Sequence, residues 1–221
     1  MSTEKSNKKL LLVCGLIGLF GCISVVITDL IGIVVVDGYN PISQTISDLA
    51  IHKKAWIQDI GLNLFAASFV ACAVGLFSLN LGGWKWKTGA GILLLLAVDI
   101  LIISEYDQYA DLSSFGSTVH FTCVCILGVL FTIAPALLSF KLHKVSRGWQ
   151  LFSLWTAICW GVLSPIFFFT PNGWNGAYER FLSVIVIMWV AFISWLLVQK
   201  GLNQRLISPF TDAKATNNRS A

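Results

Sequence analysis

The apolar stretch LLLVCGLIGLFGCISVVITDLIGIVVV, residues 10–36, decides the fold of this chain, and only Ser24, Thr28 and Asp29 interrupt it. A transmembrane helix needs about 20 predominantly apolar residues, so a run of this length predicts a membrane span. Two lysines precede the run, as basic residues precede the apolar core of a signal peptide. Such a core holds only about 7–15 residues, however. We therefore expect an uncleaved first span.

The rest of the chain has a similar composition. Of its 221 residues, 56% are hydrophobic and 12% are charged, which excludes a water-soluble fold because ordinary soluble domains carry about 25% charged residues. In lipid, apolar runs without the alternating polarity of barrel strands must be helices. The sequence predicts an all-α bundle of six transmembrane helices over residues 10–200, between a tail at 1–9 and a disordered tail at 201–221. The five further runs are residues 56–81, 88–104, 115–140, 149–170 and 176–200.

Lysine and arginine are distributed unequally between the two ends of the predicted spans. Lys53, Lys54 and Arg180 fall at one end, and the other twelve basic residues fall at the end that carries both termini. Basic loops are retained in the cytoplasm, so we expect the N-terminus and the C-terminus to be cytoplasmic. The basic residues are scattered over tails and short loops, so no nucleic-acid partner is predicted despite the net charge of +4.

The ionisable residues within the spans fall in the outer halves once this topology is applied. A charge at mid-membrane costs about 2.5–3.5 kcal/mol on insertion scales, so charges seldom face lipid. Their concentration predicts a polar cavity that opens outward between the helices, and the outer loops add further candidates. These residues are Asp29, Asp99, His120, Glu179 and Arg180 in the spans, and Ser47, Asp48 and Asp107 in the loops.

The charged residues in the spans also have structural interpretations. Asp29 and Glu179 could reach the outer headgroups or pair with Arg180. Asp99 lies deeper, so it needs a specific partner, and Arg180 is the natural one.

The remaining candidates have structural interpretations as well. Ser47 and Asp48 could be the start of a helix, because serine is a favoured N-cap and aspartate suits the first turn. His120 could be a hydrogen-bonded residue that packs helices together.

Three stretches carry a family resemblance: YNPISQTISDLA (residues 39–50), DQYADLSSFGSTVH (107–120) and NGAYERFLSVIVIMW (175–189). They resemble the uncharacterised multi-spanning membrane proteins grouped as domain of unknown function 998, found mainly in bacteria and archaea. The resemblance implies a six-span fold with a shared polar site, and it favours the cell membrane of a prokaryote. The corresponding site residues are Ser47, Asp48, Asp107, His120, Glu179 and Arg180.

Two looser likenesses concern lipids. The chain resembles distantly the Frag1/DRAM/Sfk1 group of six-span proteins associated with lipid handling, which makes a membrane lipid the expected partner. An analogy with the zinc hydrolases of the ceramidase and adiponectin-receptor class is not supported by the ligands these enzymes need. The chain has three histidines, and His143 falls on the inner side, so no metal site is predicted.

One functional hypothesis is an intramembrane hydrolase that acts on a lipid substrate from the outer leaflet. Asp48, Asp107 and His120 would be its catalytic acid/base residues, and Arg180 would clamp an anionic headgroup. No cofactor is assigned, because the sequence holds no nucleotide loop, HExxH or GxSxG motif.

Two other hypotheses need no bond-breaking chemistry. In an ion-coupled transporter, Asp29 and Asp99 would exchange protons or cations, although polar residues do not continue into the inner halves of the spans. In a non-catalytic, lipid-handling membrane component, the polar cluster would hold the helices together. Its binding residues would be Ser47, Asp99, Glu179 and Arg180.

Overall fold

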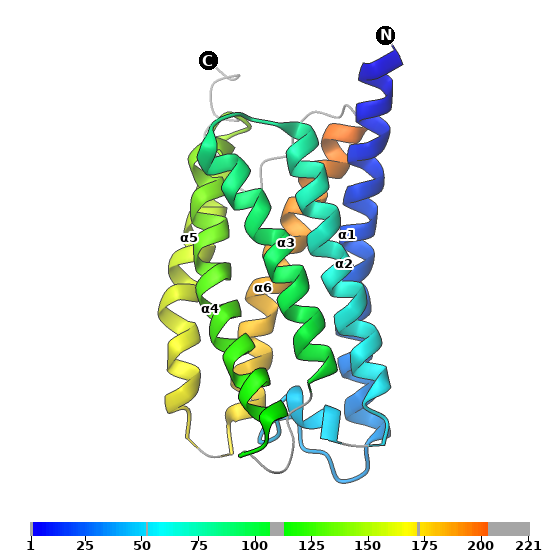
Figure 1. The fold of residues 1–221 in the computed structure, drawn as a ribbon, viewed down its shortest axis with the longest axis vertical. Helices are drawn as coiled ribbons and strands as arrows, with labels where there is room; N and C mark the ends of the chain where they lie inside the picture. The colour runs from blue at the N-terminus through cyan, green and yellow to red at the C-terminus, as the bar shows by residue number, and fades with distance from the viewer. Residues whose placement is uncertain (1, 52, 107–112, 172, 203–221) are drawn as a thin grey trace, which may run out of the picture.

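In the computed structural model, residues 2–51, 53–106, 113–171 and 173–202 are described, and they form a bundle of helices (Figure 1). Six helical segments are long and apolar enough to cross a membrane, and no strand occurs in the ranges covered. The predicted six-helix, all-α membrane fold is therefore confirmed. The elements are α1 (Ser2–Val35), η1 (Ser47–Ile51), α2 (Trp56–Leu79), α3 (Trp84–Glu105), α4 (Phe115–Leu142), α5 (Arg147–Leu163), η2 (Ser164–Phe169) and α6 (Asn175–Gly201), where η denotes a 3₁₀-helix.

Two helix boundaries differ from the predicted runs. α1 begins at Ser2, well before the apolar stretch, because the lysines and glutamate that precede that stretch are good helix formers. The fifth run divides into α5 and η2 at Pro165, which lies in the first turn of η2. Proline lacks the N–H needed for the next helical bond and clashes with the preceding turn. Most of the predicted disordered tail, from residue 203 onward, lies outside the described residues.

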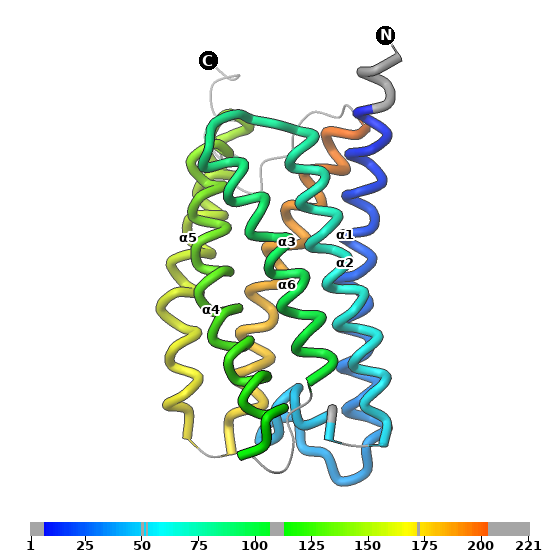
Figure 2. Tube along the Cα trace, viewed as in Figure 1, coloured from blue at the N-terminus to red at the C-terminus, as the bar shows by residue number. Residues whose placement is uncertain are grey.

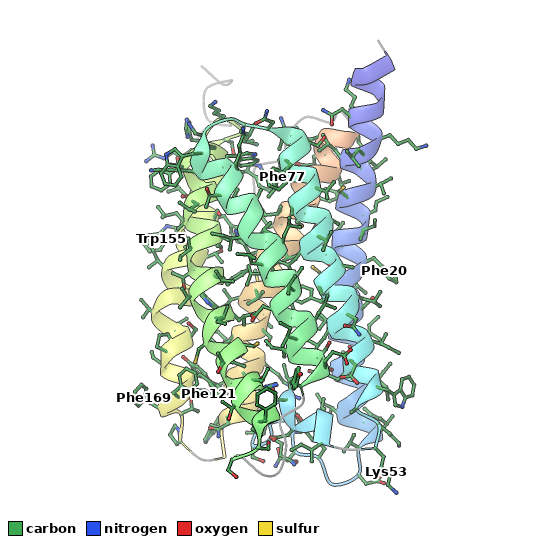
Figure 3. All side chains as sticks on the ribbon, in the orientation of Figure 1. Phe20, Lys53, Phe77, Phe121, Trp155 and Phe169 are labelled. Carbon is green, nitrogen blue, oxygen red and sulfur yellow. The ribbon has the colours of Figure 1, made fainter. Side chains whose placement is uncertain are left out.

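The helices follow one another around the bundle. α3 packs between α2 and α4, α4 packs along α5, and α1 packs along both α2 and α6. Figures 1 and 2 show the start of α1 and the end of α6 at one end of the bundle, here called the terminal end, and η1 at the opposite end, here called the η1 end. Large apolar side chains point outward along the sides, as Phe20 and Trp155 do in Figure 3, where they can face lipid.

The half of the bundle toward the terminal end is filled by large side chains. Trp86, Trp149 and Trp189 are fully buried there. Trp86 donates its indole N–H to the Leu76 carbonyl at 2.9 Å, and Trp189 donates to Ser153 Oγ at 3.0 Å. The large cavity described below lies in the other half, toward the η1 end.

Candidate functional site

The connection between α1 and α2 folds onto the start of α6. The backbone N–H of Ala177 donates to the Ile42 carbonyl at 2.9 Å. A Cβ atom at Gly176 would lie 2.6 Å from the Pro41 carbonyl oxygen and closer still to that of Gln44. Glycine at this position is what allows the two backbones to approach so closely.

Arg180 fastens the same connection to α6 and α1. Its Nε and Nη2 donate to the two carboxylate oxygens of Asp29, at 3.1 and 2.9 Å. Nη1 donates to the carbonyls of Pro41 and Gln44 at 2.9 and 3.1 Å, and Nη2 donates to the Tyr39 hydroxyl at 2.8 Å. All five guanidinium N–H groups therefore have acceptors. Arg180 keeps no donor with which to clamp an anionic headgroup.

Tyr39 extends this network along the connection. Its hydroxyl donates to the Thr45 carbonyl at 2.5 Å while it accepts from Arg180. Burial raises the pKa of Tyr39 to about 12, and the hydrogen bond from Arg180 lowers it only in part. The phenol therefore remains neutral at physiological pH and can donate.

Asp99 lies apart from this network. It is 5% exposed, its carboxyl shares a hydrogen bond with the Cys123 thiol, and its Oδ2 has no partner within the part of the chain that the structure describes. The interpretation of Arg180 as the partner of Asp99 is wrong. α6 packs against α1, which brings Asp29 to Arg180, whereas α3, which carries Asp99, packs against α2 and α4.

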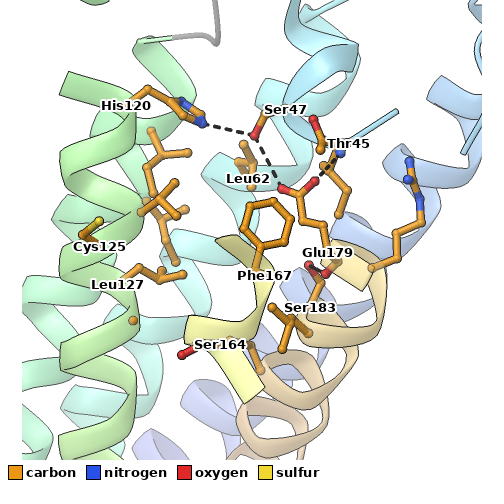
Figure 4. A pocket seen from close by; sticks show the side chains of 18 of the residues that line it. Thr45, Ser47, Leu62, His120, Cys125, Leu127, Ser164, Phe167, Glu179 and Ser183 are labelled. Carbon is orange, nitrogen blue, oxygen red and sulfur yellow. Dashed lines mark hydrogen bonds between the residues drawn. The ribbon is translucent and has the colours of Figure 1, made fainter. Parts of the chain in front are cut away.

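Ser47 begins η1 and lies between His120 of α4 and Glu179 of α6, and these three residues are called here the Ser47 cluster (Figure 4). Ser47 Oγ is 3.1 Å from His120 Nε2 and 3.5 Å from Glu179 Oε1. His120 Nδ1 is 2.7 Å from the carbonyl oxygen of Tyr106. Glu179 Oε2 accepts the backbone N–H of Ile46 at 2.6 Å. Glu179 thus holds the backbone that presents Ser47.

The hydrogen bonds of His120 fix the direction of its contact with Ser47. A carbonyl oxygen can only accept, so the neutral imidazole carries its proton on Nδ1 and offers the lone pair of Nε2. The Ser47 hydroxyl then donates to His120, over the shorter of its two contacts. The contact with Glu179 is at the outer limit of hydrogen-bond distance. Ser47 is therefore a hydroxyl paired with a base.

Asp48 is engaged in the local structure of the loop. Its carboxylate accepts the Thr45 N–H at 2.7 Å, and its own N–H bonds to Thr45 Oγ1 at 3.1 Å. Asp48 does not occur among the described residues that line the cavity. Asp48 thus lies in the first turn of η1 as expected, but the interpretation of Ser47 as the N-cap is wrong, because Thr45 supplies the capping hydroxyl. Asp107, the other predicted acid/base residue, lies outside the described residues.

A cavity of about 1230 Å³ adjoins the Ser47 cluster in the half of the bundle toward the η1 end. Its walls are largely apolar and include Leu62, Leu127 and Phe167 (Figure 4). Two amide oxygens of cavity-lining residues, Gln58 Oε1 and Asn175 Oδ1, are buried with no hydrogen-bond partner among the described residues. The cavity therefore combines largely apolar walls with the polar groups of the Ser47 cluster.

The cavity is not closed off from the surface of the bundle, because several side chains that line it are also about half exposed. They are Leu30 of α1, Val129 of α4, Phe168 of η2 and Val184 of α6. These side chains are apolar, so this part of the cavity wall suits hydrocarbon better than water.

No group of three or more histidine, cysteine, aspartate or glutamate side chains within the described ranges is arranged to hold a metal ion. His120 has both ring nitrogens engaged, one with Ser47 and one with Tyr106. The contacts that the structure shows for His120 are therefore hydrogen bonds to other groups of the protein.

The family model described as "Protein of unknown function (DUF998)" matches residues 19–196 of the chain. The chain belongs to this family. No curated protein and no solved structure matches it. The matched range contains the docked connection, the Ser47 cluster and the cavity, so the site lies within the DUF998 domain. The family resemblance expected from the three sequence stretches is confirmed.

Sequence reasoning missed three residues of the site. Tyr39 and Asn175 fall within the stretches that carry the family resemblance, so a signal for them was present. Gln58 is a polar residue near the start of an otherwise apolar run, where it could pass for an interfacial residue. Its burial, at 3% exposed, is evident only from the packing of α2.

Proposed function

We propose that this DUF998 protein binds one membrane lipid inside the bundle, with the hydrocarbon part in the cavity and the polar end at the Ser47 cluster. The cavity is the observation that supports this function. Sites for drug-sized ligands measure about 300–1,000 Å³. A cavity of about 1230 Å³ with apolar walls and one polar end suits a larger amphiphile.

The charges at the polar end of the cavity favour a lipid with a neutral polar end. Glu179 of the Ser47 cluster lines the cavity, and its carboxylate is a hydrogen-bond acceptor. Arg180, the cationic residue next to Glu179 in the sequence, is already paired with Asp29. A neutral polar end with hydroxyl or amide groups therefore fits better than a phosphate.

The half-exposed apolar side chains of the cavity wall support entry of this lipid from the bilayer. We place both termini in the cytoplasm, because the sequence assigns twelve of the fifteen lysines and arginines to the side of the predicted spans that carries both termini. The Ser47 cluster then lies in the outer leaflet of the cell membrane. A transport function lacks comparable support, because Trp86, Trp149 and Trp189 fill the half of the bundle between the cavity and the terminal end.

The proposal is tested by native mass spectrometry of protein purified in mild detergent, together with a variant that fills the cavity. Gly128 lines the cavity, and a Cβ atom there meets nothing closer than Ser164 Oγ at 3.9 Å, so Gly128→Phe can enter the empty space. Gly91 of α3 is a matched control, because a Cβ there has no neighbour within 4 Å and Gly91 is outside the cavity lining.

We expect one lipid per chain in the wild-type protein and in Gly91→Phe, and at least a tenfold lower occupancy in Gly128→Phe. Equal occupancy in the three proteins would show that the lipid binds elsewhere. A wild-type protein that carries no lipid, and takes up none from vesicles of a total lipid extract, would contradict the proposal.

A further inference from the structure

Ser47 and His120 have the arrangement of a nucleophile and its general base. We infer that Ser47 attacks a carboxylic ester of the lipid in the cavity, which makes the protein an intramembrane acyl hydrolase. This inference rests on the proposed lipid binding and adds a reaction to it. It assigns the nucleophile to Ser47, whereas the sequence had suggested Asp48 and Asp107 as the catalytic partners of His120.

The geometry satisfies the requirements for an activated serine. A nucleophile and its base lie within about 2.6–3.2 Å of each other, and a third group orients the base. Ser47 Oγ and His120 Nε2 are 3.1 Å apart, and the Tyr106 carbonyl holds His120 through Nδ1 at 2.7 Å. The carbonyl thus fixes the tautomer in which Nε2 can take the serine proton.

Other hydroxyl groups of the cavity are engaged differently. Ser183 Oγ donates to the Glu179 carbonyl at 2.9 Å, and Thr132 Oγ1 donates to the Gly128 carbonyl at 2.8 Å. Both acceptors belong to the same helix as the donor, as is usual for such residues within helices. Of these three hydroxyls, that of Ser47 contacts a base from another element, and both members of the pair line the cavity.

Glu179 acts as a positioning residue. Its Oε2 accepts the N–H of Ile46, the residue before Ser47, at 2.6 Å, and Arg180 beside it fastens the remainder of the connection. The nucleophile is therefore held by backbone contacts that tie η1 to α6, while the base is supplied by α4. A lipid ester at the polar end of the cavity meets both groups.

The reaction needs only an ester and water. His120 Nε2 takes the Ser47 proton as Oγ bonds to the ester carbonyl carbon, the carbon–oxygen bond to the alcohol breaks, and the alcohol leaves with that proton. Water then gives a proton to His120 and its oxygen to the acyl carbon, which releases a carboxylic acid and restores the serine. Ester and water become acid and alcohol, and nothing is oxidised or reduced.

The inference is tested with a fluorophosphonate that carries a ten-carbon chain, added to the purified protein in detergent and followed by intact-mass measurement. Peptide mapping locates the adduct. The variants are Ser47→Ala, His120→Gln, which keeps a polar side chain but cannot act as a base, and Ser24→Ala as a control. Ser24 is outside the cavity lining and, like Ser183, donates to the carbonyl four residues before it, at 2.9 Å. Thermal unfolding of each variant establishes that it is folded, and lipid occupancy is measured on the same samples.

We expect one adduct on Ser47 in the wild-type protein and in Ser24→Ala, and none in Ser47→Ala. In His120→Gln the labelling rate should fall at least about 100-fold, the lower range for loss of a general base. Labelling at the same rate in folded His120→Gln, an adduct at another residue, or no adduct on the folded wild-type protein would overturn the assignment. A protein that holds lipid in the cavity but does not react would keep the binding function and overturn the hydrolase alone.

Discussion

Replacing Arg180 by methionine keeps a long side chain in place but removes the cation from Asp29. The two side chains are only 18% and 16% exposed, so the Asp29 carboxylate would remain mostly buried without a partner. Removing one member of a buried pair costs about 3–5 kcal/mol. The carbonyls of Pro41 and Gln44 lose their donors as well. We expect Arg180→Met to lower the free energy of unfolding by about 3–5 kcal/mol.

A second substitution separates the stranded charge from the lost hydrogen bonds. In the double variant Asp29→Asn, Arg180→Met, no buried carboxylate remains, and the missing donors cost about 1 kcal/mol each. The double variant should therefore be about 1–3 kcal/mol more stable than Arg180→Met alone, which is the coupling expected of residues in direct contact. Arg147→Met is a suitable control, because Arg147 is exposed at the start of α5 and its loss should change stability by less than about 0.5 kcal/mol.

Chemical unfolding in detergent measures these free energies, and hydrogen exchange reports on the docked connection. The N–H groups of Ile46 and Ala177 bond to the Glu179 carboxylate and the Ile42 carbonyl, so both should exchange faster in Arg180→Met. The reasoning would be refuted if Arg180→Met were as stable as Arg147→Met. The reasoning would also be refuted if the double variant Asp29→Asn, Arg180→Met were less stable than Arg180→Met alone.

Three further predictions concern single residues. Gly176→Ala should displace the Gln44 carbonyl and undock the connection, seen as faster hydrogen exchange there, and unchanged exchange would contradict the close approach. Gln199 is fully buried with neither amide atom bonded among the residues described, so Gln199→Met should raise the free energy of unfolding by about 1–3 kcal/mol, and a decrease would show that its polar group is needed. Tyr39→Phe should cost about 1 kcal/mol through the lost bonds to Arg180 and the backbone. Folding raises the Tyr39 pKa from 10.0 to about 12, so the wild-type advantage over Tyr39→Phe should be complete below pH 10 and shrink as pH rises toward 12; an advantage independent of pH would contradict this.

The positions of the charged residues along the bundle could be predicted better than their partners. Asp29, Glu179 and Arg180 were expected near one end of the spans, and the structure places them there. The choice between Asp29 and Asp99 as the partner of Arg180 could not be made from hydropathy, because it depends on which helices are neighbours. The packing of α6 against α1 decides it.

The break at Pro165 likewise depends partly on the local sequence and partly on the packing of the helices. A proline disturbs any helix that contains it, because the missing N–H is a local property of the residue. The local sequence does not determine that the remainder of the span becomes η2, whose Phe168 lines the cavity. That outcome depends on where η2 packs, and not on the proline alone.

The sequence by itself determined that this protein has six membrane helices and that its polar residues gather toward one end. Lipid penalises every polar group and every unpaired backbone group separately, so these features follow from the local composition of the chain. The tertiary structure alone decided that the Ser47 hydroxyl meets His120, 73 residues away, and that Asp29 neutralises Arg180. These contacts require the order of the helices and the docking of the α1–α2 connection on α6, which arise from packing over the whole bundle.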